Sequence, residues 1–193
     1  HLPAPVADET FRDEFGFVFL DNEGIGPFYI SMQDILPGVS QRYPRPEQCE
    51  EDAVYLLQGF ASEDPAARAL ALGTYNALSA SLYQAAGFEP PDRTADSGLN
   101  GLSSGQRVGM VGYFSPLVDK LTARGCEVVV LERSPERVVE RPGVVVTENP
   151  QDLAGCRQLL CTASTLINDS LEDVLAASRT GVRFELVGPS GSG

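Results

Sequence analysis

The second half of the chain alternates strand-like apolar segments with helix-like segments, and this alternation limits the possible folds more than any other feature. Residues 127–131, Glu-Val-Val-Val-Leu, are almost wholly apolar, as expected for a strand that helices cover on both faces. Further strands are predicted over residues 106–111, 144–146, 158–162 and 182–187. Helices are predicted to begin at the capping residues Ser115 and Ser170. This order predicts a parallel sheet with right-handed crossovers, that is, a Rossmann-like α/β domain over residues 106–193.

The first half of the chain predicts a small α+β domain over residues 1–88. Aromatic side chains alternate along residues 15–20, a turn-forming segment follows, and residues 25–30 complete a predicted β-hairpin. Three prolines and a glycine between residues 36 and 47 predict a loop.

Two helices are predicted after this loop. The first runs from Cys49 to about Phe60 and has an apolar face of Val54, Leu57 and Phe60. The second begins at Asp64-Pro65, a capping residue followed by a first-turn proline, and ends at Gly87. Its predicted apolar face consists of Leu70, Ala77, Leu78 and Leu82. Residues 89–105 are rich in proline, glycine, serine and aspartate and are predicted to link the two domains.

The charge balance argues against two classes of partner. The chain has 27 acidic and 14 basic side chains, which give a formal net charge of -13. Such a surface repels phosphate backbones and anionic lipids, so we expect neither nucleic acid nor a membrane as partner. Because no apolar run approaches about 20 residues and no secretory signal is visible, a cytoplasmic protein is expected. The start at His1 and the end directly after a strand are compatible with further native residues at either end. Association into a homo-oligomer stays open.

The thiols and the single histidine argue against a zinc site. The four cysteines, Cys49, Cys126, Cys156 and Cys161, form no CxxC pair, and the only histidine is His1. We therefore expect free, mostly buried thiols. Any metal would need oxygen donors or a bound chelator.

The predicted sheet places the candidate ligand site at the carboxyl ends of its strands. In the first turn, Gly112 allows close backbone approach, and the helix start at Ser115 offers N–H groups to an anion. Tyr113, Phe114 and Pro116 crowd the same turn. Three interpretations stay open: a site for a nucleotide or S-adenosylmethionine, a site for another small ligand, or a turn that only packs strand against helix.

Other polar residues extend this candidate site. Glu132 lies 20 residues after Gly112, where ribose-binding acids usually occur, but it can equally form a surface pair with Arg133 or Arg137. The loop of residues 162–168 offers three hydroxyls and an amide, more than helix capping requires. Asn76, inside the long helix, is either a structural cross-link to the other domain or a ligand contact. Cys161 is interpreted as a core residue, because no histidine is available as its base.

Four ordered motifs resemble a known family. They are Val111-Gly-Tyr-Phe-Ser-Pro-Leu117, Val130-Leu-Glu-Arg-Ser-Pro135, Thr162-Ala-Ser-Thr-Leu-Ile-Asn168 and Val187-Gly-Pro-Ser190. Together with Ala71–Leu78 they resemble the putative heavy-metal-chelation family of bacterial and archaeal proteins. The resemblance implies an enolase-N-terminal-like domain joined to a Rossmann-like domain, with a site in the cleft between them. It points to Asn76, Tyr113, Phe114, Ser115, Glu132, Thr162, Ser164, Thr165, Asn168 and Ser190 as ligand-binding residues, to which the turn itself adds Gly112.

These observations lead to one functional hypothesis and two alternatives. The first is a protein that binds a small polar ligand or metal chelate in heavy-metal chelation or homeostasis. The second is an enzyme of chelator biosynthesis that uses NAD(P) or S-adenosylmethionine, and the third is a structural or adaptor subunit. A metal ion or metal chelate is favoured over the nucleotide-type cofactors. No catalytic residue is assigned, because no nucleophile–base pair is visible.

Overall fold

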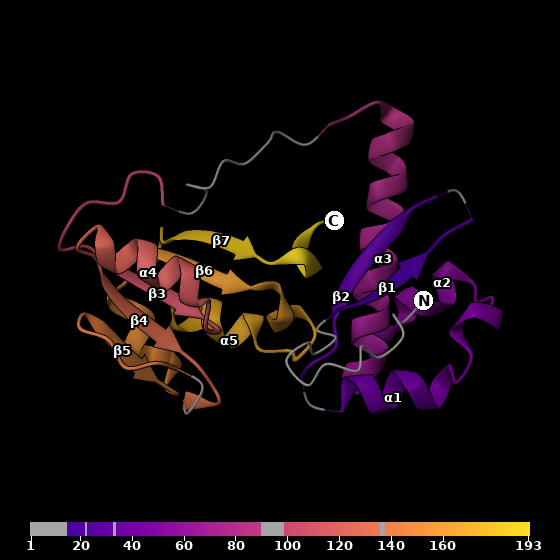
Figure 1. The fold of residues 1–193 in the computed structure, drawn as a ribbon, viewed down its shortest axis with the longest axis horizontal. Helices are drawn as coiled ribbons and strands as arrows, with labels where there is room; N and C mark the ends of the chain where they lie inside the picture. Colours follow the sequence, from indigo (N-terminus) through magenta and orange to yellow (C-terminus); the bar gives the residue numbers. More distant parts are fainter. Residues whose placement is uncertain (1–14, 22, 33, 90–98, 136–137) are drawn as a thin grey trace. The chain divides into compact units, whose positions relative to one another are not determined.

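The computed structural model describes residues 15–21, 23–32, 34–89, 99–135 and 138–193. The chain divides into two compact units (Figure 1), and each is described by itself. Unit 1 consists of His1–Pro90, Leu166–Asn168 and Gly188–Gly193, and unit 2 consists of Pro91–Thr165 and Asp169–Val187. Unit 1 thus includes two short segments from the second half of the sequence.

Unit 1 combines a two-stranded sheet with helices. Its elements are β1 (Phe15–Phe19), β2 (Ile25–Tyr29), α1 (Ile35–Arg42), η1 (Pro46–Gln48), α2 (Ala53–Leu57), η2 (Gln58–Ala61), α3 (Pro65–Ala86) and η6 (Pro189–Gly191). The predicted hairpin is confirmed, because β1 and β2 pair antiparallel with Phe17 opposite Pro27.

The loop predicted over residues 36–47 is wrong, since most of it forms α1 and η1. Pro37 lies in the first turn of α1, where a backbone N–H has no intrahelical acceptor, so the proline does not break the helix. Ile35 and Val39, one turn apart, are buried. A Cβ added at Gly38 would lie 2.8 Å from the Ala66 Cβ, so the glycine lets α1 approach α3 closely.

The first predicted helix is shorter than expected. It begins at Ala53 because the Asp52 side chain caps it, accepting the N–H groups of Val54 (2.7 Å) and Tyr55 (3.1 Å). It tightens into the 3₁₀ turn η2 after Leu57. Its predicted apolar face is wrong at two positions, because Val54 is 67% and Phe60 43% exposed.

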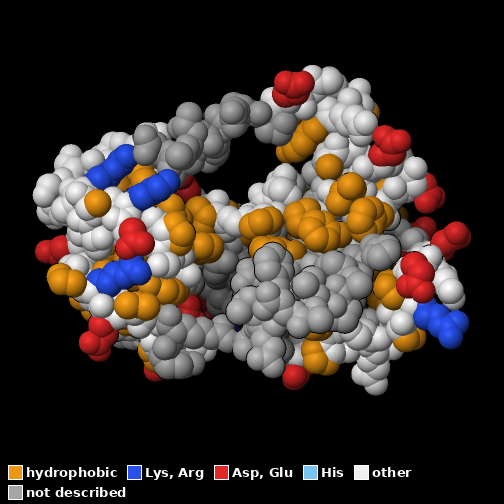
Figure 2. All heavy atoms as spheres, in the orientation of Figure 1, with side chains coloured by type: hydrophobic (Ala, Val, Ile, Leu, Met, Phe, Trp, Pro, Cys, Tyr) orange, Lys and Arg blue, Asp and Glu red, His pale blue; other side chains and the backbone are white. Residues whose placement is uncertain are grey.

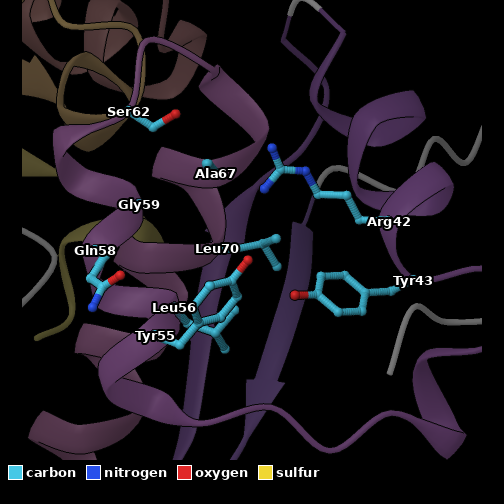
Figure 3. Close-up of a pocket in the computed structure, with 9 residues that line it drawn as sticks. All are labelled: Arg42, Tyr43, Tyr55, Leu56, Gln58, Gly59, Ser62, Ala67 and Leu70. Carbon is cyan, nitrogen blue, oxygen red and sulfur yellow. The ribbon is translucent and has the colours of Figure 1, made fainter.

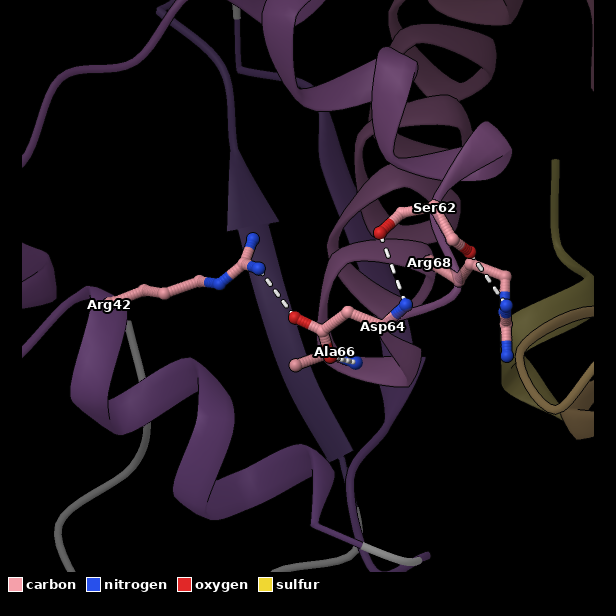
Figure 4. A network of polar contacts seen from close by, with 5 residues as sticks. All are labelled: Arg42, Ser62, Asp64, Ala66 and Arg68. Carbon is pink, nitrogen blue, oxygen red and sulfur yellow. Dashed lines mark hydrogen bonds and ion pairs between the residues drawn. The ribbon is translucent and has the colours of Figure 1, made fainter.

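The long helix α3 has the predicted ends. Asp64 accepts the N–H of Ala66 at 2.8 Å, and Gly87 ends the helix with φ 61°. The other carboxylate oxygen of Asp64 accepts from Arg42, and the Arg68 guanidinium donates to the Ser62 carbonyl at 2.6 Å (Figure 4). These contacts fix the start of α3 against the segments before it.

The buried face of α3 ends sooner than predicted. Leu70 and Ala77 are buried, whereas Leu78 is partly exposed and Leu82 is 67% exposed. Hydrophobic side chains therefore remain visible at the molecular surface (Figure 2).

The core of unit 1 forms where α3 packs on β2. A Cβ added at Gly26 would lie 1.9 Å from the Gly73 carbonyl oxygen, so strand and helix backbones touch. Ile167, from the second half of the chain, is fully buried in this core. The other buried residues of the cluster are Phe28, Ile30, Ile35, Val39, Ala66, Ala69, Leu70 and Leu72.

Unit 2 is built on a five-stranded parallel sheet of order β5-β4-β3-β6-β7. Its elements are β3 (Arg107–Val111), α4 (Ser115–Ala123), β4 (Glu127–Leu131), β5 (Val144–Thr147), η4 (Pro150–Gly155), β6 (Gln158–Thr162), η5 (Ala163–Leu166, whose last residue belongs to unit 1), α5 (Leu171–Ala177) and β7 (Arg183–Val187). The chain adds strands on one side of β3 up to β5 and then on its other side. The order therefore reverses between β3 and β6, the position where open α/β sheets bind ligands.

Helices cover both faces of this sheet, as the apolar strands predict. On one face α4 packs over the strands, through Val118, Leu121, Val108, Met110, Val128, Val130 and Leu160. On the other face α5 and η4 pack over them, through Val174, Leu153, Val111, Val129, Leu159 and Cys161. Alternate residues of β3 and β4 thus enter two separate cores.

The predicted α/β class is confirmed by the parallel sheet and its helices. The names Rossmann-like and enolase-N-terminal-like, and the boundaries 1–88 and 106–193, stay predictions. Of the predicted linker 89–105, residues 90–98 lie outside the described residues. Within the described part of the chain, no helix is long and apolar enough to cross a membrane.

The contact of Gly26 with α3 predicts that one added methyl group will destabilise the fold strongly. Gly26→Ala should lower the free energy of unfolding by about 3 kcal/mol, because its Cβ meets backbone atoms that cannot rotate away. Gly155→Ala is the matched control, since its Cβ meets only the Arg107 side chain, at 3.3 Å. Urea unfolding measures both, and equal stability of the two variants would contradict this packing.

Candidate site at the carboxyl edge of the parallel sheet

Two polar loops meet at the carboxyl edge of the sheet, one after β3 and one after β6. Gly112 has φ 80°, and a Cβ there would lie 3.1 Å from Thr162 Cγ2. The left-handed backbone and the close approach both require glycine. The loop 112–115 therefore lies directly against the loop 162–165.

Glu132 fixes the first of these loops to the end of β4. One carboxylate oxygen accepts the Tyr113 N–H at 3.1 Å, and the other accepts the Ser134 N–H at 3.1 Å. The predicted pairing with Arg133 is not among the bonds of this carboxylate, and Arg137 lies outside the described residues. Each carboxylate oxygen therefore holds one backbone N–H group and keeps a further acceptor position, so Glu132 shapes the site and can still accept from a ligand.

The hydroxyls after β6 bond mainly to one another. Thr162 Oγ1 donates to Ser164 Oγ at 3.1 Å and accepts the Ser164 N–H at 3.3 Å. Thr165, 1% exposed, donates to the Thr162 carbonyl at 2.8 Å. A hydroxyl has one donor and two acceptor positions, so Ser164 keeps its own proton available for a ligand.

The start of α4 carries the remaining predicted residues of unit 2. Phe114 is the capping residue and Ser115 the first helical residue, so the cap lies one position earlier than predicted. Ser115 Oγ accepts from Arg141 at 2.9 Å, and Arg141 also pairs with Asp119. The Tyr113 hydroxyl is buried and has no hydrogen-bond partner among the described residues.

Sequence reasoning missed Arg141. No motif marks Arg141. It precedes β5 and reaches Ser115 only because β5 and α4 pack into the same hydrophobic core. Its positive charge is shared between the Asp119 carboxylate and Ser115, at the end of α4 that attracts anions.

The other three predicted residues lie in unit 1. Asn76, 2% exposed, donates to the carbonyls of Pro27 (2.8 Å) and Ser190 (3.0 Å) and so joins α3, β2 and η6. Its Oδ1 and the Ser190 hydroxyl are buried without a partner in the described part of the chain. The Asn168 amide lies 3.6 Å from Met32 Sδ. The interpretation of Asn76 as a structural cross-link therefore has direct contacts in its favour.

The thiols do not form a metal-binding set. Cys126 lies in the core beneath α4, whereas Cys156 and Cys161 lie in the core on the opposite face of the sheet. Burial raises the pKa of the Cys161 thiol to about 11, although its hydrogen bond to Thr165 lowers it, and burial also raises the pKa values of Cys126 and Cys156. In the described ranges no three His, Cys, Asp or Glu side chains are grouped to hold a metal ion. These donors do not fit a resident bare heavy-metal ion.

Two cavities, one in each unit, are lined by other residues, although Arg141 lines the second of them. One, of about 200 Å³, lies in unit 1 between α1, α2, η2 and α3 (Figure 3). The other, of about 570 Å³, is an open hollow along residues 140–146 of unit 2. Neither of these two cavities is lined by a residue that the sequence predicted for the site.

The two hydrogen bonds of Glu132 predict that replacing this side chain will destabilise the ligand-free protein. Glu132→Gln replaces one accepting oxygen by an NH₂ group, which faces a backbone N–H, so unfolding should become easier by about 1–3 kcal/mol. Glu148→Gln, at an exposed position, is the control. If Glu132 served only a ligand, denaturant unfolding of the ligand-free protein would not distinguish the two variants.

The burial of three of the four thiols predicts that the cysteines will differ in their reactivity toward a thiol reagent. At pH 8 a disulfide reagent should modify the exposed Cys49 rapidly and all four thiols only in urea. Because the folded pKa of Cys161 is about 11 against an ordinary 9.0, its stabilising contribution is full below pH 9 and is lost as the pH rises to 11. Stability measured across this range should fall less in Cys161→Ala. Rapid native labelling of Cys161 would refute its burial.

Comparison with known proteins identifies relatives of this fold. Two solved structures, both of DUF364 proteins of unknown function, are similar to it. The one from Pyrococcus horikoshii is 18% identical, with a TM-score of 0.65, and the match covers 94% of this chain and 70% of that one. The one from Desulfitobacterium hafniense DCB-2 is 16% identical, with a TM-score of 0.63 and coverage of 92% and 68%. At these identities the likeness concerns the fold alone.

No curated protein matches the sequence. A family model does match it, over residues 97–192, which include all of the strands of unit 2. The resemblance predicted from the ordered motifs is thereby confirmed: residues 97–192 match the DUF364 family, described as putative heavy-metal chelation.

Proposed function

We propose that this protein binds a small, oxygen-rich anionic ligand at the carboxyl edge of the sheet, and that a heavy metal enters there as a chelate. The observation that carries the proposal is the contact of Gly112 with Thr162, which joins the loops after β3 and β6. These two strands are neighbours at the point where the strand order reverses. In open α/β sheets this position is the usual ligand crevice.

The chemistry of the edge favours an anion. The first turn of α4 presents the positive end of a nine-residue helix, and Arg141, which also pairs with Asp119, donates to Ser115 in that same turn. Ser164 and Tyr113 offer hydroxyl protons. Carboxylate or phenolate oxygens of a chelator would find donors here.

The metal-ligating side chains of the protein indicate whether a metal binds as a free ion or as a chelate. The family description suggests heavy-metal chelation, but the buried, separated thiols do not supply a cage for a free ion. A chelate brings its own metal ligands and needs only hydrogen bonds and charge from the protein. The interdomain location and the role in metal homeostasis stay predictions.

A metal-and-chelator screen tests this proposal. Thermal unfolding with Fe³⁺, Ni²⁺ or Zn²⁺, each alone and with citrate or a catechol, should show stabilisation by a complex and not by the free ion. A ligand at about 100 times its Kd stabilises by roughly 2.7 kcal/mol. Tyr113→Phe and Ser164→Ala should lose most of this stabilisation, and Tyr75→Phe, at an exposed position outside the edge, should keep it. Equal stabilisation of all variants, or of none, would defeat the proposal.

One observation favours the alternative of a nucleotide-type cofactor. The strand order matches that of doubly wound nucleotide-binding sheets. Against it, both Glu132 oxygens already accept backbone N–H groups, which leaves this carboxylate fewer acceptor positions for a ribose. Equilibrium dialysis with NAD(H), NADP(H) and S-adenosylmethionine separates the two, and binding that Gly112→Ala abolishes would replace our proposal by this one.

A further inference from the structure

The cavity of about 200 Å³ in unit 1 is a second candidate site, independent of the sheet edge. We propose that it takes a small organic monocarboxylate. Its polar lining includes Arg42 at the end of α1, Tyr43 beside it and Tyr55 on α2, together with Gln58 and Ser62. Leu70 of α3 and Leu56 of α2 add an apolar wall (Figure 3).

The shape limits the size of the ligand. Gly59 holds η2 against α3, since a Cβ there would lie 2.4 Å from the Ala67 carbonyl oxygen. Ala67 and Leu70 are buried and close the floor of the cavity. At about 30 Å³ per water, the volume of about 200 Å³ holds about seven waters, which is the space of one ring with one short substituent.

Arg42 and the two tyrosines supply several hydrogen-bond donors to the cavity. Figure 3 shows the Arg42 guanidinium and the Tyr43 and Tyr55 hydroxyls extending toward Leu70. One Arg42 nitrogen bonds Asp64, and a guanidinium has five N–H donors and no acceptor. Burial, followed by the charge of Glu51, raises the pKa of Tyr43, so its phenol stays protonated and donates at neutral pH. Such a set suits a carboxylate.

The surrounding charges select a monoanion. Asp64 already pairs with Arg42, and the charge of Glu51 acts on Tyr43, so the cavity has no excess of positive charge and holds a ligand mainly through hydrogen bonds. A dianionic phosphate would be repelled, and a neutral amide would not use the guanidinium. We therefore expect millimolar affinity for a compound such as benzoate.

Titration of the full chain by NMR tests this site with benzoate as the probe. The amide signal of Gly59 should shift on addition of benzoate, and that of Gly112, at the other candidate site, should not. Benzamide, which has the same shape without the charge, and inorganic phosphate should cause much smaller shifts. Failure here leaves the sheet-edge proposal untouched, because the two reporters belong to different units.

Matched variants assign the effect to named groups. Arg42→Gln should weaken benzoate about tenfold or more, and Tyr43→Phe or Tyr55→Phe about fivefold. Arg45→Gln and Tyr75→Phe, outside the cavity lining, should bind as the wild type does. The two phenylalanine variants leave the Arg42–Asp64 ion pair in place, so they test the site even if Arg42→Gln unfolds. An unshifted Gly59, equal binding of benzamide, or undiminished binding by the phenylalanine variants would overturn the proposal.

Discussion

A parallel sheet brings the carboxyl ends of all its strands to one edge, and the candidate site of this protein depends on that constraint. The loops after β3 and β6 are separated by about half of unit 2 in sequence, yet Gly112 touches Thr162 because the two strands are neighbours. Glu132, from the end of β4, then ties its own loop to the first of them. Three strand ends are thus held in one arrangement before any ligand arrives.

Most polar groups at this edge form hydrogen bonds with other groups of the same edge. Thr162 and Thr165 form hydrogen bonds within their own loop, and Glu132 accepts hydrogen bonds from two backbone N–H groups. The hydrogen-bond donors that remain for a ligand are the N–H groups at the start of α4, the Ser164 hydroxyl and the Tyr113 hydroxyl. A rigid frame with few free donors lowers the entropy lost on binding and favours anions over cations.

The core of unit 1 depends on residues from both halves of the sequence. Ile167 is fully buried among side chains of β2, α1 and α3, and Arg68 donates to its carbonyl. Burial of an isoleucine side chain is worth roughly 1.5–3 kcal/mol. Asn76 adds a second attachment by donating to the Ser190 carbonyl. The first 88 residues alone would therefore lack part of their own core.

The sequence by itself determined the elements whose signals are local. Asp64-Pro65 and Gly87 fixed the ends of α3, and the apolar run at 127–131 predicted a strand covered on both faces. Local signals failed where packing decides, as at Pro37, which the first turn of α1 accommodates. Only the tertiary structure decided which side chains are free to act. It engaged both oxygens of Glu132, brought Arg141 to Ser115, and placed Tyr43 and Tyr55 around one cavity, because such contacts depend on distances in space that no spacing along the chain encodes.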